Sequence, residues 1–164
     1  MTLANNGDSF WCRHHCGMLY AKTLKHYYCR IFRVKLGDLL KYLVTGGAGF
    51  VGSHLVDSLL DRGDSVVVLD DFSTGRKENV SHHLGSPRFT LIDGSILDEK
   101  IVEELTQASD RVFHLAAAVG VFNIIQHPLE SLTTNIRGSE NVFASCLKFN
   151  KPVLITSSSE ITGK

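Results

Sequence analysis

Residues 41–76, KYLVTGGAGFVGSHLVDSLLDRGDSVVVLDDFSTGR, contain two apolar runs with a glycine-rich segment between them. An apolar run, Lys41–Thr45, is followed by four glycines within seven residues and then by an amphipathic segment, Phe50–Arg62. A second apolar run, Ser65–Asp70, ends in a carboxylate. Short apolar runs bounded by turn residues indicate strands, and a helical period between them indicates a helix. The stretch therefore predicts a strand, a glycine turn, a helix and a second strand.

The four glycines of this turn suit the binding of a phosphate group. Gly46, Gly47, Gly49 and Gly52 lie where the first strand leads into the first helix. Glycine permits dihedrals that other residues resist and lets the backbone approach a bulky anion. The free N–H groups and positive end of the helix then attract the anion. A glycine turn can also be purely structural, but a strand before it and a helix after it favour a dinucleotide pyrophosphate.

Asp70 indicates which dinucleotide is bound. It ends the second predicted strand, 18 residues after Gly52, close to the ~20 expected of the acidic residue that binds the adenosine ribose. A carboxylate there accepts hydrogen bonds from the ribose hydroxyls and repels a 2′-phosphate. Arg76 favours NADP instead, because a nearby arginine can accommodate that phosphate. We expect NAD rather than NADP.

The remaining sequence continues the alternation of strands and helices. We expect a short helix over residues 76–84, a strand over 88–92, a helix over 98–108 opened by an Asp98 cap, a strand over 111–115, a long helix over 128–149 and a strand over 152–156. This alternation predicts the α/β class. The expected architecture is a Rossmann-type, doubly wound parallel sheet over residues 41–164, truncated after about the fifth strand.

Length, charge and composition narrow the class of protein. The 164 residues, 43% of them hydrophobic, suit one domain with an adequate core. Seventeen Lys and Arg balance 17 Asp and Glu, so we expect no nucleic acid or membrane as partner. No apolar run approaches the ~20 residues that span a bilayer, and the four cysteines form no secreted disulfide framework. A cytoplasmic protein is expected.

Five motifs together resemble those of one enzyme family, in the same order. They are VTGGAGFVGSHL (44–55), LDDFSTGR (69–76), HLAAAVG (114–120), TTNIRGSENV (133–142) and TSSSEITG (156–163). The chain resembles the extended short-chain dehydrogenases/reductases, in particular the NAD-dependent epimerase/dehydratase family of nucleotide-sugar enzymes. SSSE (157–160) is most similar to the branch of UDP-glucuronate decarboxylase and UDP-glucose 4-epimerase. The resemblance implies a tightly held NAD⁺ that transiently oxidises a sugar carbon and returns the hydride.

The resemblance also implies which residues meet the cofactor. The pyrophosphate would lie on Gly46, Gly49, Phe50 and Val51, with Gly52 packing the helix on the sheet, and Asp70 would bind the ribose. The adenosine loop would be completed by Asp71, Phe72, Ser73, Thr74 and Gly75. Ser95 replaces the family's adenine-contacting Asp, and Ser95 and Ile96 are weaker adenine-side candidates. Leu115, Ala116 and Ala117 would line the middle of the cofactor.

Three further residues near these motifs are interpreted differently. Asp93 is one residue off the register of the family's adenine-contacting Asp, and we expect it to be solvated. Asn135 matches an asparagine of the family's central helix, although an asparagine in a helix is more often a surface or capping residue. His114 is expected to be a packed strand-end histidine, neither a ligand nor a base.

The catalytic end of the sequence departs from the family. Ser158 matches the family's Ser or Thr after the fifth strand, and Ser159 and Glu160 match accessory residues of the decarboxylase branch. The family's general base is the Tyr of a Tyr-x-x-x-Lys pair, whose Lys lowers the pKa of that Tyr. No such pair occurs in this sequence, and Thr162 stands where the family usually has a tyrosine.

Three interpretations of the whole chain follow from this departure. The chain is a truncated NAD-binding portion of a nucleotide-sugar epimerase, dehydratase or decarboxylase, inactive alone, or a stand-alone module that needs a partner chain, or a non-functional gene fragment. We favour the first. A nucleotide sugar is the substrate, and a homodimer the assembly, that the resemblance implies for an intact relative.

Residues 1–40 differ from the rest, because they are rich in Cys, His, Arg and Tyr without a clean period. CRHHC (12–16) and Cys29 have the chemistry of zinc ligands but not the paired spacing of structural zinc sites. Six Lys and Arg against one acid in residues 1–36 would suit a transit peptide or basic arm, but serines are few and cysteines many. We expect an atypical extension that is disordered or poorly packed.

Overall fold

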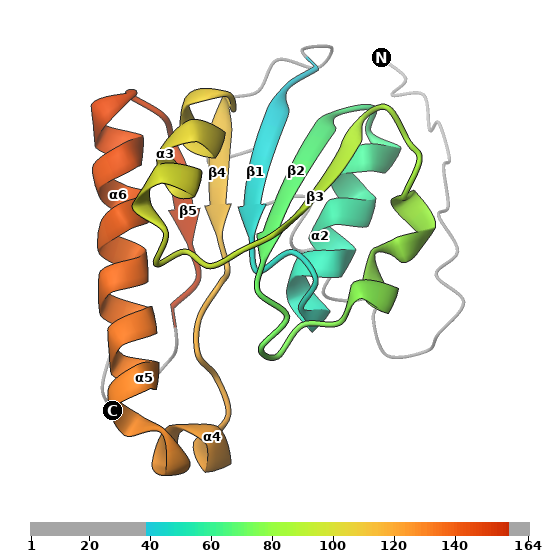
Figure 1. The fold of residues 1–164 in the computed structure, drawn as a ribbon. Helices are drawn as coiled ribbons and strands as arrows, with labels where there is room; N and C mark the ends of the chain where they lie inside the picture. The colour runs from blue at the N-terminus through green and yellow to red at the C-terminus, as the bar shows by residue number, and fades with distance from the viewer. Residues whose placement is uncertain (1–38, 158–164) are drawn as a thin grey trace, which may run out of the picture. The chain divides into compact units, whose positions relative to one another are not determined.

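The computed structural model describes residues 39–157, which belong to a unit that runs from Leu39 to Lys164. The expectations for the first 38 residues, including the zinc interpretation, therefore lie outside the described residues. Five parallel strands form one sheet in the order β3-β2-β1-β4-β5 (Figure 1). The strands are β1 (Lys41–Thr45), β2 (Ser65–Asp70), β3 (Phe89–Asp93), β4 (Arg111–His114) and β5 (Val153–Ile155).

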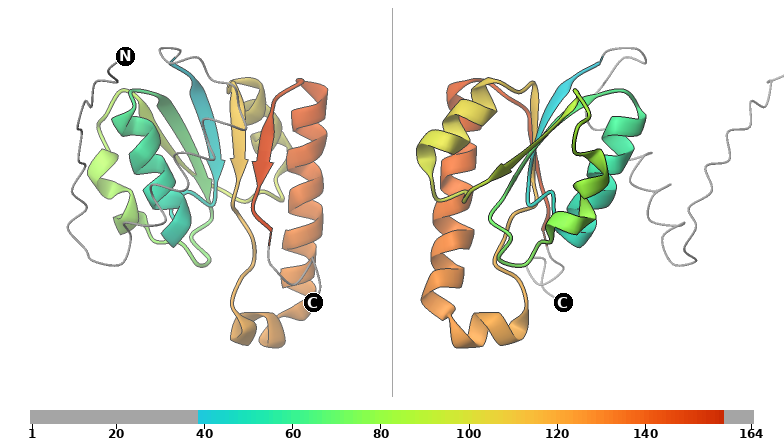
Figure 2. Two further views of the ribbon diagram at one scale, coloured as in Figure 1. Left: turned by 180° about the vertical axis from the view of Figure 1, so that it is seen from behind. Right: turned by 45° about the vertical axis from the view of Figure 1, so that its right-hand side comes forward.

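Helices connect these strands and cover both faces of the sheet. Their bounds are α2 (Phe50–Asp61), α3 (Glu99–Gln107), α4 (Val121–Gln126), α5 (Pro128–Thr133) and α6 (Ser139–Lys148), with 3₁₀ turns η1 (Lys77–Asn79) and η2 (Ser81–His83) and a π-helical segment η3 (Thr134–Gly138). Figure 2 shows α2 on one face of the sheet and α3 and α6 on the other. The predicted doubly wound parallel sheet is confirmed. None of the helices in residues 39–157 is long and apolar enough to cross a membrane.

The two-residue period of the strands explains why both faces are covered. Alternate side chains of a strand point to opposite faces. Leu43, Val67 and Val112 belong to a buried cluster that includes Val142 and Cys146 of α6. The intervening residues of β1, β2 and β4, such as Tyr42, Val68 and Phe113, are buried as well. Strands that are apolar on both faces require a helical layer on each side.

Local sequence accounts for the ends of several elements. The Asp98 side chain accepts hydrogen bonds from the backbone N–H groups of Lys100 and Ile101, at 3.1 and 3.2 Å, which confirms the predicted cap of α3. At the other end of the sheet, the buried Asp64 carboxylate accepts hydrogen bonds from Leu40 N and Arg62 Nε. These contacts fix the start of β1 and the end of α2.

The structure differs from the sequence-based expectation in the connections. The predicted helix over residues 76–84 is two single 3₁₀ turns, because Val80, with φ −125° and ψ 1°, interrupts the helical dihedrals between them. The predicted helix over residues 128–149 is continuous as α5, η3 and α6, but its middle is π-helical. The helix α4 was not expected, because its six residues are too few to show a helical period.

Candidate functional site

The candidate site lies where β1, β2 and β4 end, beside the glycine turn. The strand order reverses at β1, whose two neighbours belong to opposite halves of the sheet, and ligands of open α/β sheets bind at such a point. Gly46, with φ +72°, lies directly against the segment after β4, and a Cβ on it would come within 2.6 Å of Ala116 N. Only glycine fits this conformation and this contact.

The start of α2 has the properties of an anion site. A Cβ at Gly52 would lie 2.2 Å from the carbonyl oxygen of Gly46, so the helix presses on the turn as closely as glycine allows. Within residues 39–157 no side chain caps α2, and the first turn of this helix contains no acidic residue. The first N–H groups of a helix have no partner within it. These uncapped donors, beside the exposed side chains of Phe50 and Val51, suit a pyrophosphate.

Asp70 lies beside this turn at the end of β2. Its Oδ2 accepts a hydrogen bond from Ala48 N and its Oδ1 one from Phe72 N, both at 2.9 Å. The residue is only 7% exposed. Burial raises the pKa of this carboxyl, and the two backbone hydrogen bonds oppose the rise. Each carboxylate oxygen can accept a second hydrogen bond, so the group fits the paired hydroxyls of a ribose.

The predicted adenosine loop, residues 71–75, is tied to the glycine turn through Ala48. The Ala48 carbonyl accepts hydrogen bonds from Arg76 N at 3.1 Å and from Asn79 Nδ2 at 2.8 Å. Phe72 has φ +56°, which is unusual for a bulky residue, and Ser73 N donates to Asp71 Oδ1 at 3.0 Å. The loop therefore has a defined and strained conformation beside Asp70, as functional loops often do.

Thr74 and Gly75 lie in the same loop, and Gly75 lies over the carboxylate. A Cβ at Gly75 would come within 2.9 Å of Asp70 Oδ1. The Thr74 and Arg76 side chains are exposed. The sequence did not indicate Asn79, because only the fold brings its amide to Ala48. In the sequence, only its place three residues after Arg76, at the end of the turn η1, indicates that Asn79 lies near the adenosine loop.

The residues expected at the adenine side have different surroundings. Ser95 is half-buried, and its Oγ accepts a hydrogen bond from Leu97 N at 3.2 Å. The Ile96 side chain is buried in the cluster under α6, so only its backbone can face a ligand at this edge. Asp93 is exposed and pairs with Lys77 at 2.9 Å, which confirms that it is solvated.

A buried chain of hydrogen bonds stands behind the site. His114 Nδ1 lies 2.8 Å from Thr45 Oγ1, and its Nε2 lies 3.0 Å from Ser139 Oγ. Ala116 N donates to the same Thr45 Oγ1 at 3.3 Å, so the threonine hydroxyl is free to donate to Nδ1 of a neutral imidazole. Burial lowers the pKa of His114 to about 4. The prediction of a packed histidine is confirmed.

Asn135 fixes the segment that follows β4. Its Oδ1 accepts a hydrogen bond from Ala118 N at 2.7 Å, and its Nδ2 donates to Ala118 O at 3.2 Å. The π-helical segment that carries Asn135 begins one residue earlier. The clamp holds the segment in which Leu115 and Ala116 are half-buried and Ala117 is exposed, so these residues border the glycine turn in a fixed conformation.

The predicted catalytic residues Ser158, Ser159 and Glu160 lie outside the described residues, as does Thr162. The described part of the chain leads toward the site, because β5 pairs with β4 in parallel up to Ile155. Beyond it, Thr156 N donates to the carbonyl of His114 at 3.5 Å. Thr156 thus lies at the same edge of the sheet as the glycine turn.

Sequence comparison finds relatives over the same part of the chain. The profile of the NAD dependent epimerase/dehydratase family matches residues 42–164. UDP-glucuronic acid decarboxylase 4 of Arabidopsis thaliana is 41% identical over 125 residues, which are 76% of this chain and 27% of that protein. The chain thus spans about a quarter of the length of this curated relative.

Solved structures of related enzymes share the fold. UDP-N-acetylglucosamine 4-epimerase from Methanobrevibacter ruminantium, in complex with UDP-N-acetylmuramic acid, is 35% identical with a TM-score of 0.70, over 77% of this chain and 40% of that one. UDP-glucose 4-epimerase from Thermus thermophilus, in complex with NAD, is 34% identical with a TM-score of 0.59, over 67% of this chain and 34% of that one. With its glycine turn, its strand order and a family profile that matches residues 42–164, this chain belongs to the NAD dependent epimerase/dehydratase family.

Proposed function

We propose that this chain is the NAD-binding portion of a nucleotide-sugar epimerase, dehydratase or decarboxylase. The observation that carries the proposal is the uncapped start of α2, closed against Gly46 and lying beside the buried Asp70. The donors suit a pyrophosphate and the carboxylate suits a ribose. The family profile and the NAD complex of the Thermus thermophilus relative support the same cofactor.

In this proposal each part of the site has one task. The backbone of Gly46, Gly49, Phe50 and Val51 binds the pyrophosphate, and Asp70 binds the adenosine ribose and disfavours a 2′-phosphate. Loop residues Asp71–Gly75 enclose the adenosine, with Ser95 and the backbone of Ile96 at the adenine side. Bound NAD supplies a hydride acceptor for a sugar carbon. Leu115, Ala116 and Ala117 shape the middle of the cofactor site, and Ser158, with Ser159 and Glu160, would meet the sugar.

The substrate class rests on the relatives. Both solved relatives described above are UDP-sugar 4-epimerases by name, and the Arabidopsis thaliana relative is a UDP-glucuronic acid decarboxylase. A nucleotide sugar is therefore the substrate that we propose for the enzyme of which this chain is a part.

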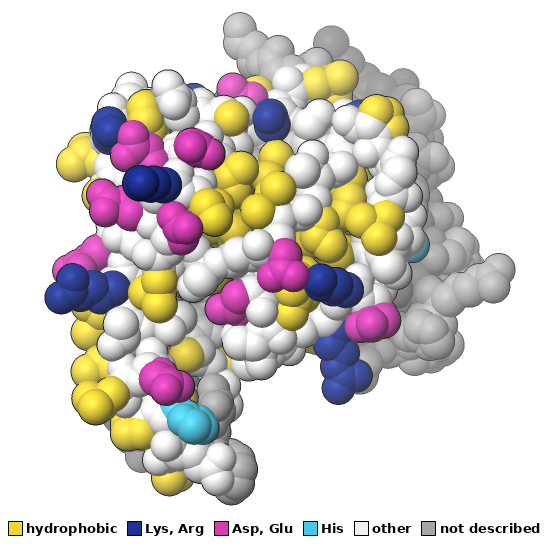
Figure 3. Space-filling model, in the orientation of Figure 1, with side chains coloured by type: hydrophobic (Ala, Val, Ile, Leu, Met, Phe, Trp, Pro, Cys, Tyr) yellow, Lys and Arg dark blue, Asp and Glu magenta, His cyan; other side chains and the backbone are white. Residues whose placement is uncertain are grey.

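A second candidate function is a dinucleotide-binding module that works with a partner chain. One observation favours it. Exposed apolar side chains recur at helical spacing along α5, η3 and α6, at Leu129, Leu132, Ile136, Phe143 and Leu147. Figure 3 shows hydrophobic side chains gathered at the lower left edge of the molecule, and hydrophobic and charged side chains interspersed along the upper part of that edge. Exposed apolar stripes of this kind are typical of contact surfaces.

The proposed cofactor site can be mapped directly by NMR. We expect that adding NAD⁺ to the isotope-labelled chain shifts the amide signals of Gly46–Gly52 and Phe72–Gly75. The amides of Asp64 and Asp110, which bond to Leu59 O and Lys41 O, should stay unchanged, because they lie at the opposite ends of the strands. Saturable shifts confined to the residues proposed to contact the cofactor, which are the glycine turn, the adenosine loop, Ser95–Ile96 and Leu115–Ala117, would support the proposal. Shifts that are absent at millimolar NAD⁺, or that map elsewhere, would refute it.

A further inference from the structure

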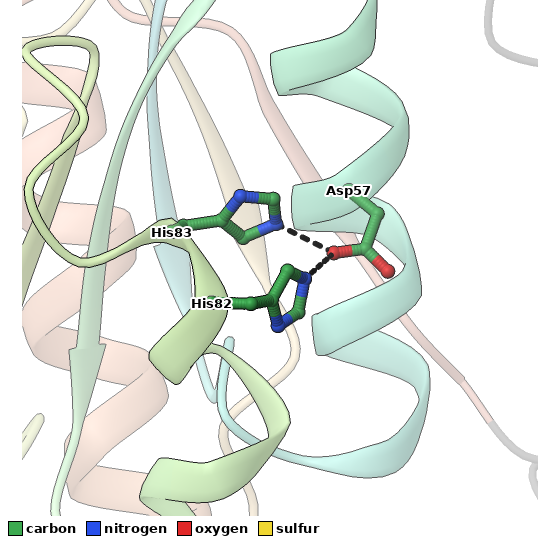
Figure 4. A group of neighbouring side chains, drawn as sticks. All are labelled: Asp57, His82 and His83. Carbon is green, nitrogen blue, oxygen red and sulfur yellow. Dashed lines mark hydrogen bonds and ion pairs between the residues drawn. The ribbon is translucent and has the colours of Figure 1, made fainter.

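Two histidines and an aspartate converge on the surface between α2 and η2. Asp57 lies on α2, and His82 and His83 are adjacent in η2. Figure 4 shows both imidazole rings directed at the Asp57 carboxylate. One ligand atom from each of the three side chains can be chosen so that all lie within 4.8 Å of one another. We propose that this cluster is a binding site for a divalent transition metal ion, with Zn²⁺ as the ion that its donors fit best.

The distances within the cluster are close to those of a zinc centre. Asp57 Oδ1 lies 3.1 Å from His82 Nε2 and 2.7 Å from His83 Nε2. Zinc binds imidazole nitrogen and carboxylate oxygen at about 2.0–2.2 Å, so tetrahedral ligand atoms lie about 3.3 Å apart. Small outward shifts of the two imidazoles would therefore place the three atoms around one ion.

The cluster also has the donor chemistry that zinc prefers. Imidazole and carboxylate ligands suit zinc, whereas calcium and magnesium require oxygen ligands throughout. Without a metal, the carboxylate accepts hydrogen bonds from the two imidazoles, which requires a proton on each Nε2. A metal ion would replace both protons, because it binds the unprotonated nitrogens.

Packing holds part of the site in place and leaves the rest accessible. The His83 side chain is 16% exposed, and its ring centroid lies 5.5 Å from that of Phe89. The His82 and Asp57 side chains are 56% and 36% exposed. An ion can therefore enter from solvent, while His83 stays oriented. Three protein ligands also leave a coordination position open for water or for a fourth side chain.

His54 is the side chain placed to fill that position. It lies one helical turn before Asp57 on α2, with its Nδ1 3.9 Å from Asp57 Oδ2. Its side chain is 64% exposed, and a change of rotamer toward the ion would break the edge contact of its ring with Phe50, whose centroid lies 5.2 Å away. A bound ion would link α2, in the connection from β1 to β2, to η2, in the connection from β2 to β3. The proposal rests on this cluster alone and is independent of the proposed cofactor site.

The test must separate this cluster from the cysteines of residues 1–38. Zinc binding is measured by calorimetry on the full chain with Cys12, Cys16 and Cys29 replaced by Ser. We expect one equivalent of Zn²⁺ to bind and to raise the unfolding temperature, because the ion binds only the folded state. Asp57→Asn and His83→Gln should each weaken binding by at least about tenfold. The control His127→Gln, which replaces an exposed histidine next to α5, should change the affinity for Zn²⁺ by less than about twofold.

Cobalt spectroscopy on the unmodified full chain provides the second measurement. The difference spectrum between this chain and its Asp57→Asn variant isolates the Co²⁺ bound in the cluster, and it should show visible absorption without a thiolate charge-transfer band. Circular dichroism checks that each variant is folded. If the folded Cys→Ser chain binds no Zn²⁺, or if Asp57→Asn and His83→Gln bind it as tightly as their parent, the cluster is only a set of hydrogen bonds and the proposal is wrong.

Discussion

Two buried titratable residues near the site, Asp70 and His114, have opposite roles in its electrostatics. Burial raises the pKa of Asp70, so its ionised form is held in the fold at some cost. Burial lowers the pKa of His114, so that residue is neutral at physiological pH and adds no positive charge behind the cofactor site. Burying an ionised carboxylate destabilises the fold, and such groups are typical of sites that bind a ligand.

The low pKa of His114 predicts an acid sensitivity of the fold. The folded pKa of about 4 lies below the ordinary value of 6.5. Between these values the unfolded chain binds the proton and the folded chain does not. The contribution of His114 to the free energy of unfolding is therefore complete above about pH 6.5. It is lost as the pH falls toward 4, by about 1 kcal/mol per pH unit near pH 5.

Urea unfolding between pH 7 and pH 4.5 measures this dependence. Replacement of His114 by Asn removes the titrating group, so the slope of the unfolding free energy against pH should become smaller by that amount. His127→Gln, at an exposed position, should leave the slope unchanged. Identical slopes for the wild type and the His114 variant would show that His114 does not cause the acid sensitivity.

At the scale of elements, the contact between α2 and the glycine turn determines the shape of the proposed pyrophosphate site. Gly52→Ala would place a Cβ 2.2 Å from Gly46 O and 2.8 Å from Gly47 Cα, against the backbone of the turn. We expect the start of α2 to move and the unfolding free energy to fall by about 1–3 kcal/mol, with loss of NAD⁺ binding.

Gly85 offers a matched control for Gly52. It has φ +91°, and a Cβ at this position would have no neighbouring atom of residues 39–157 within 4 Å, so Gly85→Ala should cost only the strain of its dihedrals, about 1–2 kcal/mol. Its NAD⁺ affinity should be unchanged. Thermal unfolding and NAD⁺ titration of both variants check these outcomes. If Gly52→Ala keeps wild-type affinity, the close packing of α2 on the turn is not needed for the site.

The regular elements could be predicted from the sequence because their signals are local. The apolar runs at Lys41–Thr45 and Ser65–Asp70 coincide with β1 and β2, and the Asp98 cap marks the start of α3. The short connections could not be predicted as well. Two 3₁₀ turns and a π-helical segment depend on contacts such as the Asn135 clamp on Ala118, which only the folded chain creates.

At the scale of the whole molecule, the resemblance of five motifs to the NAD-dependent epimerase/dehydratase family is confirmed by the family profile. The contacts around the site were less accessible to sequence reasoning. The chain from Thr45 through His114 to Ser139 joins residues that are far apart in sequence. The same is true of Asp57 and His82–His83, whose side chains meet only because η2 packs beside α2.

The affinities of the chain for NAD⁺ and NADP⁺ show whether Asp70 binds the adenosine ribose. Calorimetry compares the wild-type chain with Asp70→Ala and with the control Asp93→Ala, which removes an exposed carboxylate from the neighbouring strand end. The Asp70 side chain also holds Ala48 N and Phe72 N, so its loss loosens the loop for both cofactors. The effects of Asp70→Ala on NAD⁺ and NADP⁺ binding differ for two reasons. NAD⁺ loses its ribose hydrogen bonds to the carboxylate, and NADP⁺ is freed from the repulsion of its 2′-phosphate.

We predict that the wild-type chain binds NAD⁺ more tightly than NADP⁺, and that Asp93→Ala does not alter this preference. Asp70→Ala should weaken NAD⁺ binding by at least about tenfold and NADP⁺ binding less, because losing hydrogen bonds to a charged group costs about 1.5–3 kcal/mol. A wild-type chain that binds no NAD⁺ while folded, or an Asp70→Ala variant with an unchanged preference, would contradict the proposed cofactor site.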